Sequence, residues 1–277
     1  MPFYANWYRF GLLWRFGDGL LRSLRRDPDW PHPQRSMNRT NDRHRAQMAQ
    51  YILDELDGRP DLVEQAMPDC PPYGKRILVD NHWFKTLRRD NVSLVTSAVS
   101  GIEGDTVVAE DGSRHRVDVV VLATGFEAGK LLSPIEVRGR SGVPLSEVWG
   151  DDDPRAYLGI TVLDHPNLFC MLGPGTGIAR GGSAIFQAEC QIRYITRCLV
   201  QMIETGAASL EVRADVHDEY IERFDAAHSE SVWSHAGMRN WYRNEAGRAF
   251  GPMPWRLVDY WAMTHDADLG DYRVVRR

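Results

Sequence analysis

The stretch that decides the fold is His115–Phe126, which reads HRVDVVVLATGF. At its centre is an almost unbroken, largely β-branched run made of Val117, Val119, Val120, Val121 and Leu122. Such a run is typical of a strand covered on both faces, as the parallel strands of an α/β sheet are. The run ends in Ala123, Thr124 and Gly125, which are small enough for a ligand to lie against the backbone. Ligands of open α/β sheets bind at this carboxyl end of a strand.

The residues before this run predict a β-hairpin. In the sequence VVAEDGSRHR, the pair Asp111-Gly112 supplies the positive φ angles that a two-residue hairpin turn needs. A hairpin followed by a buried strand that ends in Ala-Thr-Gly resembles the ATG motif of flavoproteins with two dinucleotide-binding domains. Asp118 then corresponds to the acidic residue that leads into the strand. The alternative is an ordinary core strand that ends in a turn, and this is the commoner reading of the strand alone.

Composition narrows the classes of function. The chain has 277 residues, 43% hydrophobic and 26% charged, as soluble globular proteins commonly have. A net charge of −5 gives no reason to expect a nucleic-acid partner. Four cysteines without a C-x-x-C pair indicate reduced thiols in a cytoplasmic protein. Nine histidines lack the spacing of metal ligands, and no apolar stretch reaches 18 residues, so we expect neither a metal site nor a transmembrane helix.

The first 24 residues predict an amphipathic helix. Apolar side chains recur there at helical spacing, namely Phe3, Trp7, Phe10, Leu13, Trp14 and Leu20. Such a stripe either lies on a membrane surface or packs on the rest of the protein. Packing is the commoner case and is the one we expect. The segment lacks the basic start and continuous apolar core of a signal peptide.

The rest of the chain alternates between expected helices, strands and loops. Three prolines exclude a helix at residues 27–34. Either Thr40 or Asn41 is expected to cap the next helix. We expect helices over 40–56, 60–67, 83–89, 183–204 and 215–227, strands over 92–95 and 168–172, and an irregular segment over 127–165.

A glycine-rich loop precedes the helix that Ser183 is expected to cap. Its glycines are Gly173, Gly175, Gly177, Gly181 and Gly182. Backbone N–H groups approach a ligand closely in such a loop, and a helix N-terminus favours negative charge. The loop is not a G-x-G-x-x-G motif, because Arg180 stands where a third glycine is needed. A glycine-rich connection without a ligand is the plain alternative.

About fifty residues separate this loop from the Ala-Thr-Gly run. In that context the loop resembles the last FAD-contacting segment of flavin monooxygenases. The resemblance implies that Gly173, Gly175 and Thr176 contact FAD, together with Ala123, Thr124 and Gly125.

Lys75 and Arg76 follow a Pro/Gly loop and precede ILVDNHWFKTLRRDNV at residues 77–92. Most basic pairs are simply exposed, but this context is similar to that of Baeyer–Villiger monooxygenases. By that resemblance Lys75 binds the 2′-phosphate of NADPH. Arg76 is the catalytic residue, whose guanidinium stabilises the anionic flavin peroxide and its adduct with a ketone. Trp241, in NWYRN, matches a tryptophan of the mobile loop that closes over NADP, although simple aromatic packing also accounts for it.

Taken together, these segments resemble the C-terminal half of a Baeyer–Villiger flavin monooxygenase of the hydroxyacetophenone branch. The similarity runs from PFYANWYRFGLLWRFGDGLL through GKRILVDN, VLATGF and HPNLFCMLGPGT to NWYRN. It implies an α/β, partial two-dinucleotide-binding-domain flavoprotein fold with a mainly helical N-terminal segment. The expected parts are a helical segment at 1–70, the end of an NADPH-binding domain at 71–116 and the end of an FAD-binding domain at 117–277. FAD, NADPH, O2 and a ketone are the implied cofactors and substrates, and an ester or lactone is the product.

The sequence departs from this family in one respect. It contains neither the two G-x-G-x-x-G-type motifs that hold the cofactor pyrophosphates nor the fingerprint F-x-G-x-x-x-H-x-x-x-[WF]. Three explanations are open: a second polypeptide that supplies the other half, a truncated reading frame, or a non-catalytic interaction protein. An N- or S-oxidising monooxygenase is the alternative chemistry. We expect the isolated chain to be poorly soluble, because the strand at 117–124 lacks its sheet neighbours.

Overall fold

The computed structural model describes residues 2–179, 181–236 and 238–276. The chain forms two compact units. The first unit comprises Met1–Arg45, Cys70–Ile77 and Ala128–Arg277, and the second comprises Ala46–Asp69 and Leu78–Glu127. Each unit is described by itself.

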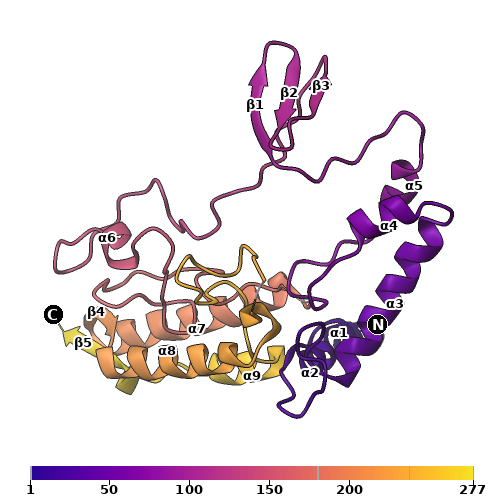
Figure 1. Ribbon diagram of the computed structural model, residues 1–277. Coiled ribbons are helices and arrows are strands. Elements are labelled where there is room, and N and C mark those ends of the chain that lie inside the picture. The colour runs from indigo at the N-terminus through magenta and orange to yellow at the C-terminus, as the bar shows by residue number, and fades with distance from the viewer. Residues whose placement is uncertain (1, 180, 237, 277) are drawn as a thin grey trace. The chain divides into compact units, whose positions relative to one another are not determined.

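Figure 1 shows the elements in chain order. The helices of four or more residues are α1 (Pro2–Phe16), α2 (Leu21–Leu24), α3 (Arg39–Glu55), α4 (Pro60–Ala66), α5 (Trp83–Leu87), α6 (Leu145–Trp149), α7 (Ala184–Thr205), α8 (Ala214–Ser229) and α9 (Leu257–Met263). The strands are β1 (Val99–Glu103), β2 (Thr106–Ala109), β3 (Arg114–Arg116), β4 (Ala207–Val212) and β5 (Tyr272–Arg276). Within the described residues they form two antiparallel sheets, β1-β2-β3 and β4-β5. None of the described helices is long and apolar enough to cross a bilayer.

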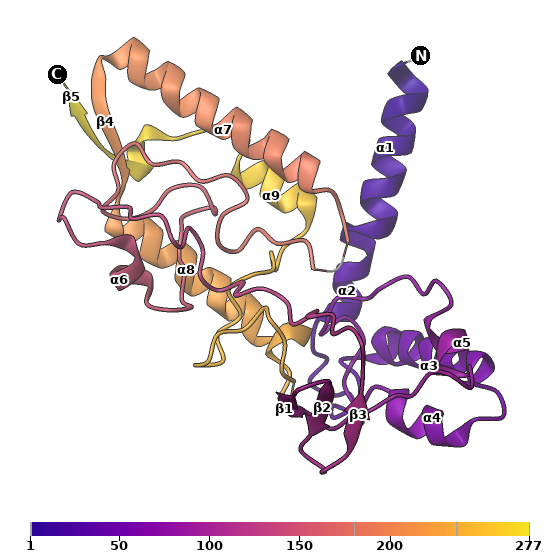
Figure 2. The same ribbon diagram turned by 90° about the horizontal axis from the view of Figure 1, so that it is seen from above.

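Helix α7 is the longest of the described helices and lies beside α9 (Figure 2). Ser183 caps it, as predicted: its side-chain oxygen accepts a hydrogen bond from the Phe186 N–H at 3.2 Å. The predicted helices at 60–67, 83–89 and 215–227 are likewise confirmed as α4, α5 and α8. The main core joins α7 to β4, α8 and β5 through buried residues that include Leu158, Ile160, Tyr194, Cys198, Val212, Tyr220 and Tyr272.

Helix α7 is apolar on its outer side as well. Four residues there, Ile185, Ile192, Leu199 and Ile203, are 73%, 52%, 46% and 81% exposed. Their spacing of seven, seven and four residues places them along one face, opposite the buried face. A helix with two apolar faces is typical of a helix with packing partners on both sides. The described residues cover only one of the two sides.

The predicted hairpin is confirmed in the second unit. Strands β2 and β3 pair antiparallel, with Thr106 opposite Arg116. Gly112 has a φ of 84° at the turn, and the Ser113 N–H donates to the Asp111 carboxylate at 2.9 Å. The Ala109 N–H donates to the Ser113 carbonyl oxygen at 3.0 Å, so the turn has three residues rather than the two predicted, and of the Asp-Gly pair Gly112 takes the left-handed position.

The strand expected at residues 117–122 is wrong for this structure. Residues 117–127 form no strand, and Val119, Val121 and Leu122 are 76%, 81% and 77% exposed. A strand needs hydrogen-bonding neighbours. In the part of the chain that the structure describes, no strand pairs with this run. The β-branched sequence therefore remains extended and uncovered.

Two other expected strands are also wrong. Residues 92–95 pair with no strand among the described residues, although Val92 and Leu94 pack beside the buried side chain of Leu87. In the segment 168–172, only Phe169 forms an isolated bridge, with Thr161. Short apolar runs fill the core here without joining a sheet.

The N-terminal helix differs from the prediction in length and packing. Helix α1 ends at Phe16, Gly17 interrupts it, and a short 3-10 turn and α2 complete residues 18–24. Its side chains do not pack as expected, because Phe3, Trp7 and Phe10 are 67–71% exposed. The side chains of Leu13 and Trp14, which the prediction included, lie outside the described part.

The cap of α3 also differs from the prediction. The side-chain oxygen of Asn38, rather than that of Thr40 or Asn41, accepts the N–H groups of both those residues at 2.9 and 3.0 Å. Asn41 is buried and instead accepts the Met37 N–H at 3.2 Å. The helix therefore begins one residue earlier than expected, at Arg39.

Candidate active site

The loop at residues 71–76 is held by the start of α3. The Asn41 side-chain amide donates to the Pro72 carbonyl oxygen at 3.2 Å. The Tyr73 hydroxyl forms a hydrogen bond with Nδ1 of His44 at 2.9 Å. Tyr73 has a φ of 72°, a left-handed conformation that is costly for a residue with a Cβ atom. Side-chain contacts therefore hold this loop in one strained conformation.

Gly74 brings the same loop against the segment 238–242. A Cβ atom at position 74 would lie 2.0 Å from the Met238 sulfur, far inside a normal contact. Met238 is buried with its side chain on this glycine. A side chain at position 74 would therefore displace the end of the Met238 side chain.

Arg76 lies at the glycine-rich segment 173–182. Its Nη1 atom donates a hydrogen bond to the Ile178 carbonyl oxygen at 2.5 Å. The side chains of Arg76 and its neighbour Lys75 are both exposed. A permanently charged guanidinium is thus anchored at one end while much of its surface faces solvent.

The glycines of this segment allow close packing. A Cβ atom at Gly175, whose φ is 76°, would lie 2.6 Å from the Phe224 ring. One at Gly173 would lie 2.5 Å from the Gly159 carbonyl oxygen. The N–H groups of Gly175 and Gly177 donate to the carbonyl oxygens of residues 250 and 251 at 2.9 and 2.8 Å.

Thr176 is buried, with 1% of its surface exposed. Its hydroxyl donates to the Gly173 carbonyl oxygen at 2.7 Å. Packing and internal hydrogen bonds therefore explain why glycine occurs at positions 173 and 175 and threonine at position 176. Their contact with FAD stays a prediction.

The glycine-rich segment leads directly into the N-terminus of α7. Gly182 has a φ of 109° and precedes the capping residue Ser183. Helix α7 has 22 residues, and the positive end of its dipole lies at this turn. The anchored guanidinium of Arg76 and this helix end both favour negative charge on a bound group.

Trp241 is 58% exposed, and its ring stacks on Tyr242 with centroids 4.6 Å apart and planes 32° apart. Tyr242 is 4% exposed. Burial raises the pKa of the Tyr242 phenol, while the charge of Arg76 and hydrogen bonding from Arg76 and Trp241 act against this rise. Arg76 and Trp241, both predicted site residues, therefore meet at the Tyr242 side chain.

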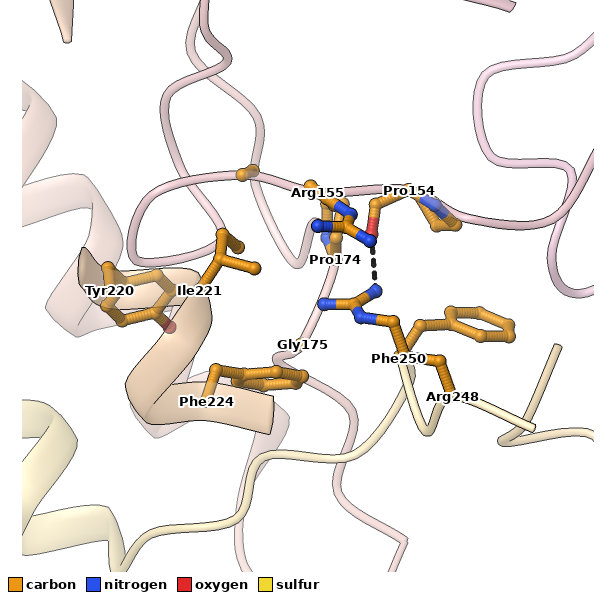
Figure 3. A pocket seen from close by; sticks show the side chains of 10 residues that line it. Pro154, Arg155, Pro174, Gly175, Tyr220, Ile221, Phe224, Arg248 and Phe250 are labelled. Atoms are coloured by element: carbon orange, nitrogen blue, oxygen red, sulfur yellow. Dashed lines mark hydrogen bonds between the residues drawn. The ribbon is translucent and has the colours of Figure 1, made fainter. Parts of the chain in front are cut away.

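Beneath the glycine-rich segment lies a small hollow, drawn in Figure 3. On one side is Arg248, whose guanidinium donates to Asp225 at 2.8 Å and to Asp153 at 2.9 Å. It also lies 5.6 Å from the centre of the Phe224 ring. Gly175 lines the same hollow. Arg248 thereby fastens the chain that follows Trp241 to α8.

Sequence comparison gives two informative relatives, although no family model matches the chain. An uncharacterized monooxygenase of Sinorhizobium fredii is 42% identical over 275 residues, which are 99% of this chain and 42% of the relative. A Baeyer–Villiger monooxygenase of Pseudomonas aeruginosa is 31% identical over 216 residues, 78% of this chain and 41% of the relative. The chain thus spans less than half the length of these relatives.

Solved structures agree with the sequence relatives. A steroid monooxygenase bound to NADP matches with a TM-score of 0.75 and 26% identity, over 89% of this chain and 47% of that chain. The OTEMO complex with FAD and NADP shares the fold at the same TM-score and 22% identity, over 85% and 45% of the two chains. The chain is related to flavin monooxygenases of the Baeyer–Villiger type. The family and the partial α/β flavoprotein fold expected from the sequence are thereby confirmed.

The predicted site residues of the chain fall into two groups. Lys75, Arg76, Trp241 and residues 173–179 belong to the first compact unit, where Arg76 contacts Ile178 and Trp241 stacks on Tyr242. The segment Ala123–Gly125 belongs to the second unit and is exposed, with a φ of 91° at Gly125. The site described here therefore consists of the first group.

Three residues of this candidate site were not predicted from the sequence. Ile178 contributes only a backbone carbonyl, which no sequence pattern reveals. Arg248 is one of many arginines, and its partners Asp153 and Asp225 lie 95 and 23 residues away. Tyr242 had a signal, because it directly follows Trp241 in NWYRN.

Proposed function

We propose that this chain forms part of an NADPH- and FAD-dependent monooxygenase that inserts one oxygen atom next to a ketone carbonyl and gives an ester or lactone. The observation that carries the proposal is the position of Arg76, anchored on the Ile178 carbonyl at the glycine-rich segment before α7. Support comes from relatives named as Baeyer–Villiger monooxygenases and from related folds solved with FAD and NADP.

The described residues fit one part of such a cofactor site. Lys75 and Arg76 are exposed cations on an ordered loop, and the positive end of α7 lies at the same segment. Lys75 would hold the 2′-phosphate of NADPH as a point charge. Trp241, with its exposed ring, would cover the bound nucleotide. The reduced flavin supplies oxygen activation when bound, and Ala123, Thr124, Gly125, Gly173, Gly175 and Thr176 would lie against it.

Arg76 would act on negative charge that develops during oxygen transfer. Its guanidinium is charged at any physiological pH and needs no proton transfer to act. The hydrogen bond to Ile178 leaves other N–H groups of the guanidinium to donate to an anionic oxygen. A donor that is already oriented stabilises a developing charge without the cost of reorganisation.

The experiment mixes the purified chain with FAD, NADPH, O2 and an aryl ketone, with and without the segment of the Sinorhizobium fredii relative that this chain does not match. Flavin absorbance reports binding, NADPH absorbance reports oxidation, and gas chromatography reports the ester. We expect ester formation in the complemented mixture. NADPH oxidation and flavin binding without ester from any ketone would overturn the Baeyer–Villiger assignment. An N- or S-oxide formed from an amine or sulfide would favour the alternative chemistry.

The exposed apolar face of α7 favours a second role, that of an interaction module. Four aliphatic residues on one helical face form the kind of surface that marks a protein contact. A polypeptide carrying the nucleotide-binding glycine motifs would be the fitting partner. A colourless chain that binds the complementary segment without binding FAD would support this role over catalysis.

A further inference from the structure

Tyr242 is a buried phenol whose oxygen is not satisfied by a regular hydrogen bond. The side chain is 4% exposed, and within the described residues its hydroxyl has no partner with full hydrogen-bond geometry. An unpaired buried hydroxyl costs about 1–3 kcal/mol, so a buried phenol without a partner calls for an explanation. Phenylalanine would fill the same space without that cost.

Arg76 and Trp241 both lie close to this phenol. Burial raises the pKa of the phenol, and the charge of Arg76, followed by polar contributions from Arg76 and Trp241, acts against this rise. The Trp241 ring also stacks on the Tyr242 ring. Tyr242 thus lies between the cationic loop and the exposed tryptophan.

The backbone fixes both sides of this arrangement. Gly74, two residues before Arg76, packs against Met238, four residues before Tyr242. The Tyr242 carbonyl oxygen accepts the Phe250 N–H at 3.0 Å. The Arg76 loop and the Tyr242 segment therefore touch where Gly74 meets Met238.

We propose that Tyr242 is a positioning residue that couples Trp241 to Arg76. The Ile178 carbonyl holds one nitrogen of the guanidinium, and the phenol oxygen of Tyr242 limits its rotation. When a nucleotide contacts the Trp241 ring, the stacked Tyr242 ring shifts, and this shift changes the orientation of the Arg76 guanidinium. This inference rests on the proposed function for its purpose, but the arrangement itself is testable on the bare chain.

The test places 3-fluorotyrosine at position 242 of the full chain and follows its ionisation by ¹⁹F NMR. The single fluorine removes any assignment problem among the ten tyrosines. We expect Arg76→Ala to raise the titration midpoint by about one pH unit, because a nearby cation is lost. Trp241→Phe is expected to raise it less, and Lys75→Ala, which removes the neighbouring cation, is expected to leave it unchanged. Equal midpoints in the parent chain and Arg76→Ala would overturn the arrangement.

A second measurement separates positioning from simple packing. Trp233 is also buried, and its ring centroid lies 6.3 Å from that of Tyr242. Its indole nitrogen has no hydrogen-bond partner within the described residues. Trp233→Phe and Tyr242→Phe therefore remove comparable polar atoms from one aromatic cluster. In the ketone assay, Tyr242→Phe is expected to lower ester formed per NADPH oxidised about tenfold, as loss of a hydrogen bond to a charged group does. Trp233→Phe is expected to leave the ratio unchanged.

The two measurements distinguish the two proposals. Absence of ester from every variant, with the expected fluorine shifts, would remove the proposed function and leave the coupling of Arg76 and Tyr242 standing. Ester formed with the same ratio by Tyr242→Phe and Trp233→Phe would leave the function standing and overturn the positioning role.

Discussion

The backbone of Gly175 runs so close to the ring of Phe224 that a Cβ atom there would lie 2.6 Å from the ring carbon Cε2. Gly175 also has a φ of 76°. We expect Gly175→Ala to destabilise the fold by about 1–2 kcal/mol through the left-handed conformation and by about 1–3 kcal/mol more through overpacking. Urea unfolding measures the sum. Gly206, with a φ of 65° and no neighbour within 4 Å, is the matched control.

Gly206→Ala carries only the conformational cost. Equal losses of stability for Gly175→Ala and Gly206→Ala would show that the Phe224 contact does not constrain the glycine-rich segment. Recovery in the double variant Gly175→Ala, Phe224→Leu would confirm that it does.

Arg76→Ala is expected to reduce ester formation at least about 100-fold while NADPH oxidation continues, because only the step that develops negative charge loses its donor. Product analysis and NADPH absorbance on one reaction mixture measure both rates. Lys75→Ala serves as the control, with a raised KM for NADPH and little change in ester per NADPH oxidised. An unchanged ester yield from Arg76→Ala would remove its catalytic assignment.

Ser183→Ala is expected to destabilise the chain by about 1 kcal/mol, because the Phe186 N–H loses its acceptor at the start of α7. The midpoint of urea unfolding reports the change. Ser183→Asp keeps an acceptor at the helix N-terminus and should retain the parent stability. A loss as large in Ser183→Asp would mean that the cap is not the stabilising contact.

Stability is expected to fall in mild acid because of His228. Burial, with a smaller effect of Arg248, lowers the pKa of His228 to about 4, while its hydrogen bond to the Pro252 carbonyl opposes the shift. Between pH 6.5 and 4 the unfolded chain binds a proton that the folded chain does not. The free energy of unfolding should therefore be highest above pH 6.5 and fall by about 3 kcal/mol on acidification to pH 4.

Unfolding at a series of pH values measures this slope. His228→Asn should flatten it between pH 6.5 and 4. The control is His82→Asn at an exposed, left-handed position that asparagine tolerates, and it should keep the parent slope. If the free energy of unfolding of His228→Asn falls with pH as steeply as that of the parent chain, groups other than His228 cause the acid sensitivity.

The isolated chain is expected to self-associate through the uncovered run at residues 117–126. Val119, Val121 and Leu122 expose most of their apolar surface there, and exposed apolar extended segments associate. Size-exclusion chromatography with light scattering measures the mass. The variant Val121→Lys, Leu122→Lys should be smaller and more soluble, whereas a monodisperse parent monomer would contradict the expectation.

Local signals in the sequence sufficed for part of the fold. Ser183 and the apolar spacing after it located α7 to within one residue at each end, since caps and helical periodicity act over a few residues. The Asp111-Gly112 pair located the hairpin for the same reason. Helices can be predicted from local sequence because their backbone hydrogen bonds join residues that are close along the chain.

Pairings between distant segments were not visible. β4 pairs with β5, about sixty residues away, and neither strand was expected. The run at 117–122 has a strong strand composition, but a strand forms only where a neighbouring strand accepts its hydrogen bonds. The composition of this segment favours a strand, but no strand among the described residues pairs with it, and the segment therefore stays extended and unpaired.

The candidate site shows the same division. Motif resemblance located Lys75, Arg76 and Trp241, which the fold gathers in one unit. The groups that hold them, the Ile178 carbonyl and the Tyr242 phenol, follow from tertiary contacts that no local pattern encodes.

The buried and exposed apolar faces of α7 are expected to tolerate substitutions differently. The buried face contributes to the stability of this chain, and the exposed face contributes to contacts with another layer. Substitutions at Ile185, Ile192, Leu199 or Ile203 change side chains that are already in water, so thermal denaturation of this chain will register little. The same substitutions will matter wherever that face meets another layer. Variants at these four positions are therefore expected to keep the parent melting temperature while losing activity in an oxygenation assay.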